Sequence, residues 1–170
     1  MRAVRCWSFC LSLFLLAGCA GYQLGPTNGL MAGSKSIQIA PFENQTNEPR
    51  LTEAVATAMR RRLQQDGTFR LATRESGDIV VRGVITRYER TALSFDPKDI
   101  LTARDFSIVM FAKVTAVDQS SGMPVLDREV SGRTTVRSGT DQASAERQAV
   151  PLLADDLARM VTALLVDGNW

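Results

Sequence analysis

Residues 36–42 read Ser-Ile-Gln-Ile-Ala-Pro-Phe, and apolar residues alternate with polar ones through the first part of this stretch. An alternation with a period of two is typical of a β-strand that buries one face. Pro41 lacks the backbone N–H that a central strand donates, so we expect central pairing to end there. The stretch therefore predicts the first strand of a sheet with one covered face.

An amphipathic helix is predicted directly after this strand. Residues 43–49 contain turn and capping residues, and Pro49 suits a first helical position. Apolar residues then recur at three- and four-residue spacings as far as Gly67, which predicts the end of the helix: Leu51, Val55, Ala58, Met59 and Leu63. The triplet at residues 60–62 is Arg-Arg-Arg, which could contact anionic lipid. Because bases near the end of a helix are favoured by its dipole, we expect these three instead to face solvent.

Three more long strands follow, at residues 78–88, 106–115 and 125–136, on the evidence of β-branched content and alternation. Residues 96–99 and 119–122 have the composition of turns, and residues 69–71 can form a short additional strand. The middle strand is apolar on both faces. Its second face, with Val109, Phe111 and Val117 nearby, either offers a partner an apolar surface or is covered by the chain's own helices and loops.

A second amphipathic helix is predicted at the end of the chain, where apolar residues repeat at helical spacing from Ala149 to Leu164. Pro151 should either open this helix or kink it. The order of elements is thus β-α-β-β-β-α. Since each helix has one apolar stripe, we predict an α+β fold: a two-layer sandwich with a mixed four-stranded sheet and both helices on one face.

The first 18 residues have the features of an export signal, with Arg2 and Arg5 before a short apolar core. Residues 16–19, Leu-Ala-Gly-Cys, resemble the bacterial lipobox, in which cleavage before the cysteine leaves Cys19 as a lipid-modified N-terminus. We therefore expect a signal peptide at 1–18, a lipidated N-terminus and short tether at 19–35, and the folded domain at 36–170. In such lipoproteins, an Asp directly after the lipidated cysteine resembles a signal that retains the protein in the inner membrane. Residue 20 here is Ala, so this resemblance implies sorting to the outer membrane.

Composition excludes several classes of function. Histidine is absent, which removes Ser-His-Asp triads and imidazole metal sites. Loss of Arg2 and Arg5 with the signal leaves 18 basic and 18 acidic residues, so nucleic-acid binding has little electrostatic support. Cys19 is then the last cysteine, and no internal disulfide can form. Most hydrolases are thereby excluded, and we predict no cofactor and no metal site.

Carboxylates alone can act as general acids and bases, and two groups of them leave an enzymatic alternative open. The acids near the predicted turn and those on the predicted last helix are nevertheless explained by turn chemistry and solvation. These residues are Asp96, Asp99, Asp105, Asp155 and Asp156.

The sequence resembles the LptE family of lipopolysaccharide-assembly lipoproteins. The resemblance lies in residues 18–24, Gly-Cys-Ala-Gly-Tyr-Gln-Leu, in residues 37–49, Ile-Gln-Ile-Ala-Pro-Phe-Glu-Asn-Gln-Thr-Asn-Glu-Pro, and in the order of elements that follows. It implies an outer-membrane lipoprotein, anchored on the periplasmic side, that plugs and helps assemble the β-barrel LptD and assists lipopolysaccharide delivery to the outer leaflet. The resemblance also implies that the protein is not an enzyme. Ala20, inserted between Cys19 and Gly21, departs from the family pattern.

The resemblance also implies that basic residues on or near loops bind the acidic lipopolysaccharide, although no motif fixes which ones. Guanidinium and ammonium groups on loops can reach phosphate without being buried, whereas isolated surface bases usually only aid solubility. The candidates are Lys98, Arg104, Arg133, Arg137 and Arg147, and we hypothesise that Lys98 and Arg104 contribute.

A lipoprotein that activates a peptidoglycan synthase is the alternative, since such activators resemble this chain in anchor, domain size and a Pro-Phe-x-Asn stretch. Those activators, however, resemble proteins with long Pro- or Gln-rich linkers between the anchor and the domain. Here only residues 19–35 precede the first strand, a mean reach of roughly 20–25 Å for a flexible chain, which is too short to cross to the cell wall.

Overall fold

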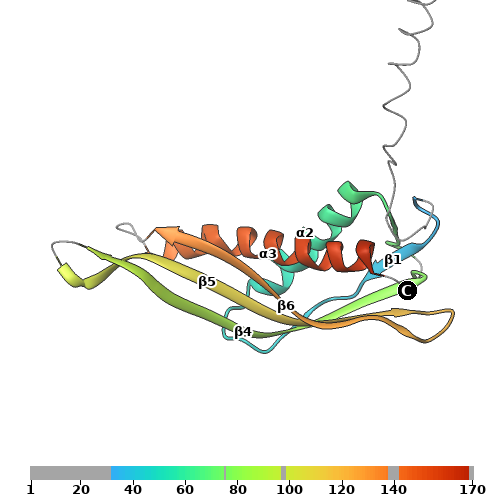
Figure 1. Ribbon diagram of the computed structural model, residues 1–170, viewed down its shortest axis with the longest axis horizontal. Coiled ribbons are helices and arrows are strands. Elements are labelled where there is room, and N and C mark those ends of the chain that lie inside the picture. The colour runs from blue at the N-terminus through green and yellow to red at the C-terminus, as the bar shows by residue number, and fades with distance from the viewer. Residues whose placement is uncertain (1–31, 75, 97–98, 138–141, 169–170) are drawn as a thin grey trace, which may run out of the picture.

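The computed structural model describes residues 32–168 except 75, 97–98 and 138–141, and the side chains of 96, 99–103, 142 and 143 are also left undescribed. A sheet forms one layer and both helices lie on one of its faces (Figure 1). The elements in chain order are β1 (Ser36–Ile39), β2 (Glu43–Asn44), α2 (Leu51–Asp66), β3 (Arg70–Leu71), β4 (Ile79–Asp96), β5 (Asp99–Asp118), β6 (Pro124–Arg137) and α3 (Gln142–Asp167). The predicted two-layer α+β fold is confirmed.

The sheet is mixed and has the order β3-β1-β4-β5-β6, with β2 also paired to β4. β1 runs parallel to both β3 and β4, while β4, β5 and β6 form an antiparallel meander. The four predicted strands are present as β1, β4, β5 and β6. The described sheet has six strands because β2 and β3, each of two residues, add to these four.

Pro41 ends the pairing of β1 as predicted, and β2 then resumes the parallel pairing with β4 two residues later. Asn44 in β2 also begins the turn that leads to α2, because its side-chain oxygen accepts the Thr46 N–H at 3.0 Å. Pro49 does not open the helix: α2 begins at Leu51, and the cap residue Arg50 makes no side-chain capping bond. Gly67 ends α2 as predicted, with φ at 76° and its N–H bonded to the Leu63 carbonyl at 3.2 Å.

The hydrophobic core lies between the helices and one face of the sheet, which we call the inner face. Ile37, Ile79 and Met110 point from the strands into this core and are fully buried. Leu51, Val55, Met59 and Leu63 line the α2 side, and Leu153, Leu157, Val161 and Leu165 line the α3 side. The opposite face of the sheet is called the outer face below.

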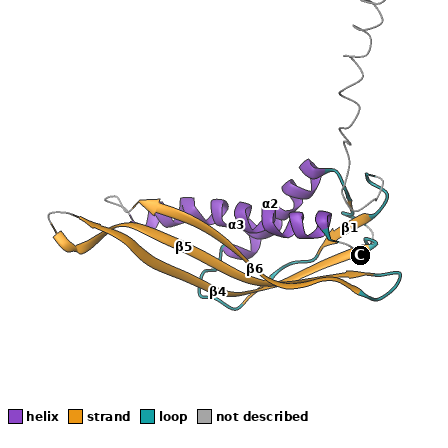
Figure 2. Cartoon of the chain, viewed as in Figure 1, coloured by secondary structure: helices purple, strands orange, loops and turns teal. Residues whose placement is uncertain are grey.

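β4 and β5 are longer than the sequence predicted, with 18 and 20 residues. Figure 2 shows their hairpin reaching beyond the first turn of α3. We call this hairpin tip the distal end. At the other end, Gly33 lies beside Thr68, with its N–H bonded to the Thr68 carbonyl at 2.9 Å, and β1 pairs with the first residues of β4. This is the tether end, and the length of β4 places the two ends roughly 55 Å apart.

α3 begins at Gln142, seven residues before the predicted helix, and runs through Pro151 to Asp167. Pro151 therefore does not open the helix, which continues through it although Pro151 has no N–H to give to the Arg147 carbonyl. The proline side chain is exposed. Burial of Val150, Leu153 and Ala154 around it therefore holds the helix together where one hydrogen bond is missing.

Candidate functional site

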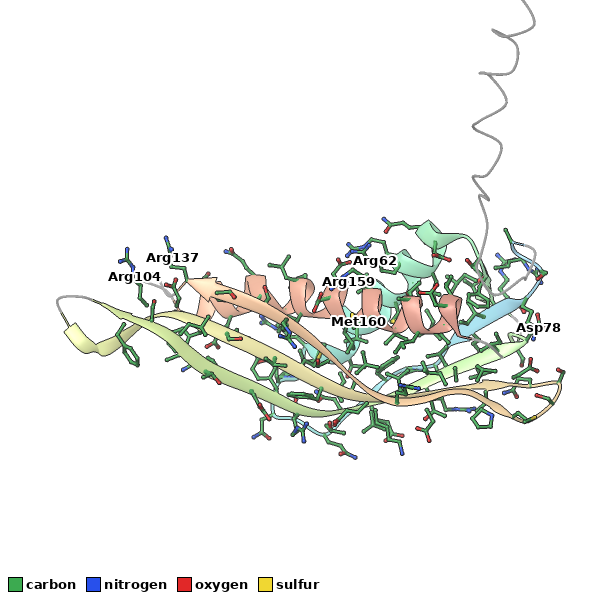
Figure 3. All side chains as sticks on the ribbon, in the orientation of Figure 1. Arg62, Asp78, Arg104, Arg137, Arg159 and Met160 are labelled. Carbon is green, nitrogen blue, oxygen red and sulfur yellow. The ribbon has the colours of Figure 1, made fainter. Side chains whose placement is uncertain are left out.

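The predicted ligand-binding residues do not all lie together. Cys19 and Lys98 are outside the described residues. Arg104 near the start of β5 and Arg137 at the end of β6 lie close to each other at the distal end (Figure 3). Arg133 and Arg147 lie elsewhere.

Asp105 connects the two distal arginines. It is the register partner of Arg137, whose Nε lies 3.1 Å from a carboxylate oxygen of Asp105. The Ser94 hydroxyl donates to the other oxygen at 2.6 Å. The pKa of Asp105 is lowered, first by the Ser94 hydrogen bond and then by Arg137, with a further contribution from the charge of Arg104. One carboxylate thus holds the Arg137 guanidinium and also lies within the electrostatic influence of Arg104.

Arg90 is a distal basic residue that sequence reasoning missed. Its guanidinium lies over the Phe106 ring, 4.6 Å from the centroid, and forms an ion pair with Glu146 of α3. It also lies on the inner face, because a bulge between Ile85 and Arg87 reverses which residues of β4 face the helices. Arg90 therefore ties the hairpin to α3.

Arg133 and Arg147 have different surroundings. The backbone N–H of Arg133 donates to the Asp156 carboxylate at 3.0 Å, while its side chain is exposed on the outer face beside Val109. Arg147 donates to Ser144 at 3.0 Å and lines a cavity of about 560 Å³ between α2 and α3. Neither is placed with Arg104 and Arg137.

Two of the three arginines at residues 60–62 of α2 contact α3. The expectation that all three face solvent is therefore wrong for Arg61 and Arg62. Arg61 and Arg62 both donate to Asp155 of α3, at 2.7 and 2.5 Å. The pKa of Asp155 is lowered, chiefly by the hydrogen bond from Arg62. Arg60 does not share this contact, and it lines a different cavity.

Three apolar residues of β5 lie half-buried on the outer face: Val109, Phe111 and Val117. No helix covers this face within the described chain, as Figure 1 shows. The guanidinium of Arg87 lies over the Phe111 ring at 4.3 Å from the centroid, and the same arginine approaches Glu129 at 3.5 Å. The outer face thus has two neighbouring apolar residues, Val109 and Phe111, bordered by charged side chains, while Val117 is separated from them by Lys113 and Thr115.

The carboxylates considered for catalysis accept hydrogen bonds from neighbouring elements in each case in which the side chain is described. Asp105 and Asp155 accept the hydrogen bonds given above, and Asp156 accepts from Arg133 and Arg159. Asp96 and Asp99 are register partners at the distal turn, and their side chains are outside the description. Among the described side chains, no group of three or more metal-ligating residues is placed to hold an ion. Neither helix of the described chain has the combination of length and apolar composition needed to cross a bilayer.

Comparison with solved structures finds the same fold in distant proteins. The hypothetical protein CT253 from Chlamydia trachomatis has 13% identity and a TM-score of 0.55, covering 75% of this chain and 93% of that one. A protein from Xanthomonas campestris has 13% identity and a TM-score of 0.54, with coverage of 84% and 88%. An uncharacterized lipoprotein B from Nitrosomonas europaea has 14% identity and a TM-score of 0.52, with coverage of 85% and 88%.

These likenesses show the fold alone, and no curated protein matches the chain. A family model described as "LptE: Lipopolysaccharide-assembly" does match, over residues 34–165. This range begins just before β1 and ends two residues before the end of α3, so it includes both layers of the domain. The chain therefore belongs to the LptE family of lipopolysaccharide-assembly proteins.

Proposed function

We propose that this protein is an outer-membrane lipoprotein that plugs and helps assemble an LptD-type β-barrel and thereby assists lipopolysaccharide delivery to the outer leaflet. The observation that carries the proposal is the family match over residues 34–165. The match favours this role over activation of a peptidoglycan synthase. The protein acts by binding and not by catalysis, in keeping with the structural engagement of Asp105, Asp155 and Asp156.

Lipid on Cys19 is the anchor in this proposal, and it holds the domain on the periplasmic side of the membrane. Two or more acyl chains give effectively permanent attachment, since each buried methylene contributes roughly 0.8 kcal/mol. The short tether then keeps the domain next to its barrel at a high effective concentration. Replacement of Cys19 by Ala is expected to give a soluble or unprocessed form in cell fractionation. Unchanged membrane retention of that variant would contradict lipidation.

The outer face supplies the apolar part of the barrel contact in this proposal. Phe111 is its largest half-buried residue and lies at the middle of β5, away from the helices. Phe111→Ser is expected to weaken recovery of the barrel, because contact area at the centre of an interface carries most of the binding energy. Lys113→Gln, two residues further along the same face, is the matched control. Equal recovery of the barrel with both variants would show that the contact lies elsewhere.

The acidic lipopolysaccharide is the proposed ligand of the distal end, where Arg104 lies with Arg137. Lys98, a residue of the predicted turn, is included in the proposal from the sequence. Each charge-assisted hydrogen bond to a phosphate contributes more than a neutral one. Arg133 and Arg147, which lie apart from this pair, are secondary members of the proposed set. Removal of charge at both Lys98 and Arg104 is expected to weaken binding of lipopolysaccharide to the purified protein. Unchanged binding would remove these two residues from the proposal.

The direct test is affinity capture of the tagged full-length chain from its native membrane after extraction in a mild detergent. The proposal expects an outer-membrane barrel of roughly 80–100 kDa, which is the size of a barrel wide enough to hold a domain, identified by mass spectrometry as LptD. Recovery of a peptidoglycan synthase in place of the barrel would favour the alternative. The Cys19→Ala variant separates loss of the anchor from loss of the protein contact.

A further inference from the structure

A polar cavity of about 330 Å³ lies near the tether end, on the edge of the sheet formed by β3. Its walls come from α2, the end of β1 and the connection between β3 and β4. The described lining residues that can donate a hydrogen bond are Gln38, Arg60, Thr73, Arg74 and Ser76. Ile39, Leu71 and Ala72 complete the wall.

The charged side chains of the described lining are both basic. Arg60 and Arg74 contribute two guanidinium groups, and no acidic side chain belongs to the described lining. Three other cavities of similar size differ in this respect, since each contains at least one carboxylate: Glu48 and Glu89, Asp66 and Asp167, or Glu53. The cavity at the β3 edge is therefore the one among these four whose side chains suit an anion.

Both arginines are also available to a ligand. Arg61 and Arg62 are bound to Asp155, whereas Arg60 and Arg74 have exposed side chains and make no ion pair or hydrogen bond with any described residue. The hydroxyls of Thr73 and Ser76 are likewise without a partner in the described chain. A ligand would therefore gain these donors without breaking a contact to any residue that the structure describes.

The connection between β3 and β4 is anchored to β1 at its far end, at Gly77 and Asp78. Gly77 approaches β1 so closely that a β-carbon there would lie 2.6 Å from the backbone nitrogen of Gln38. The Asp78 carboxylate accepts the Ser36 N–H and hydroxyl, both at 2.7 Å, at the end of the molecule seen in Figure 3. These contacts hold the backbone of β1 and of residues 77–78 together beside the cavity, so this part of its wall is formed before a ligand binds.

We propose that this cavity binds a phosphate-type oxyanion, with Arg60 and Arg74 as its charged ligands. Planar guanidinium groups bind such an oxyanion through paired hydrogen bonds. The source is either free phosphate or the headgroup of an anionic phospholipid. The second source rests on the proposed lipid anchor, because residues 19–31 would hold the tether end within roughly 20 Å of a bilayer.

The mature chain, produced without acyl groups, tests the site itself independently of the anchor. NMR titration with inorganic phosphate should shift the side-chain Nε–H signals of Arg60 and Arg74 with a common saturation curve. Arg60→Gln and Arg74→Gln should each weaken binding about tenfold, since each removes a charge-assisted hydrogen bond. Arg61→Gln is the matched control: it removes the same charge from the neighbouring position and should leave the affinity unchanged.

Vesicles distinguish the two sources. Cosedimentation with phosphatidylglycerol vesicles but not with phosphatidylcholine vesicles, lost in Arg60→Gln and Arg74→Gln and competed by phosphate, identifies a lipid headgroup. Phosphate binding without vesicle binding identifies a free oxyanion. The proposal is overturned if phosphate shifts neither signal, or if Arg61→Gln weakens binding as much as the two cavity variants. Binding that appears only in Glu75→Gln would also overturn it, since the chain's own carboxylate would then occupy the site.

Discussion

Gly132 of β6 lies directly against Leu153 of α3, so that a β-carbon placed on Gly132 would be 2.4 Å from the Leu153 carbonyl oxygen. The backbone of the helix therefore touches the backbone of the strand at this point. Next to it, the Arg133 N–H donates to Asp156 at 3.0 Å. Together these contacts place α3 over β6, the edge strand of the sheet, and cover part of an edge that would otherwise be open to pairing.

Gly132→Ala is expected to lower the free energy of unfolding by about 1–3 kcal/mol, because the added methyl group meets backbone atoms that cannot rotate away. Urea denaturation followed by circular dichroism measures the change. Ser131→Ala, at the next position and on the outer face, serves as the control and should change stability far less. An unaltered midpoint for Gly132→Ala would show that α3 can shift outward at little cost.

Asp155→Asn should weaken the contact between α2 and α3, because Asp155 accepts hydrogen bonds from both Arg61 and Arg62. All three side chains are partly exposed, so the expected loss is only about 0.2–1 kcal/mol for each pair. A double-mutant cycle of Asp155→Asn with Arg62→Gln measures the coupling. A coupling energy of zero would mean that the pair is fully replaced by water.

Asp118 should make stability depend on acid pH. Its pKa lies well below the usual range because the Lys35 ammonium donates to it at 2.7 Å and the Ser120 hydroxyl and N–H also donate to it. A carboxyl group whose pKa is lowered by folding stabilises the protein above its unfolded pKa of about 4. That contribution disappears as the pH falls from about 4 toward the lower folded pKa.

The stability difference between the wild type and Asp118→Asn should therefore be full at neutral pH and shrink below about pH 4. Thermal unfolding between pH 2 and pH 7 measures it. Lys35→Gln keeps the Asp118 carboxylate but removes its first donor. The stability of this variant should therefore also fall below that of the wild type at neutral pH, by less than that of Asp118→Asn, and the gap should shrink below about pH 4. A gap that stays constant down to pH 2 would contradict the assigned cause.

Thr162→Val is expected to leave stability unchanged or to raise it by about 1 kcal/mol. Thr162 is 7% exposed, and its hydroxyl is the one buried side-chain polar atom in the described chain without a hydrogen-bond partner. Leaving a buried hydroxyl unpaired costs about 1–3 kcal/mol, and valine has the same shape without that group. The melting temperature gives the answer. A clear loss of stability would reveal a partner for the hydroxyl, such as a bound water.

Arg104→Gln combined with Arg137→Gln is expected to weaken binding of lipopolysaccharide at least tenfold, with the larger share from Arg104, since Arg137 is already paired with Asp105. Isothermal titration with purified full-length protein measures the affinity. Arg82→Gln, an exposed arginine near the start of β4, removes one charge far from the distal end. Equal weakening by Arg82→Gln would point to nonspecific charge attraction.

Much of the fold is local and was predictable. Leu51, Val55, Met59 and Leu63 repeat with the period of a helix, and Gly67 ends it, so α2 is visible in about 16 residues of sequence. The turn at residues 96–99 and the loop at 119–122 also follow from their composition, and both separate antiparallel neighbours. A two-layer arrangement then follows because each element has one apolar face.

The remaining features depend on contacts between distant segments. The bulge between Ile85 and Arg87 reverses which residues of β4 face the helices. If the alternation of the first half of β4 is continued past the bulge, Arg90 is wrongly assigned to the outer face. Pairing of Arg61 and Arg62 with Asp155 joins residues more than 90 positions apart, which no local pattern indicates. Of the basic residues selected from the sequence, Arg104 and Arg137 meet only because residue 105 is in register with residue 137.

The parallel pairing of β1 affects how the chain acquires its structure. Ile37 pairs with Ile79, so during synthesis the first strand waits for 42 further residues before its neighbour β4 exists. The meander of β4, β5 and β6 needs no earlier residue, because its strands are joined by short turns. A nascent chain that stops before Ile79 therefore holds β1 and α2 without the surface that buries Ile37, Leu51 and Met59, and chaperones would find those side chains exposed.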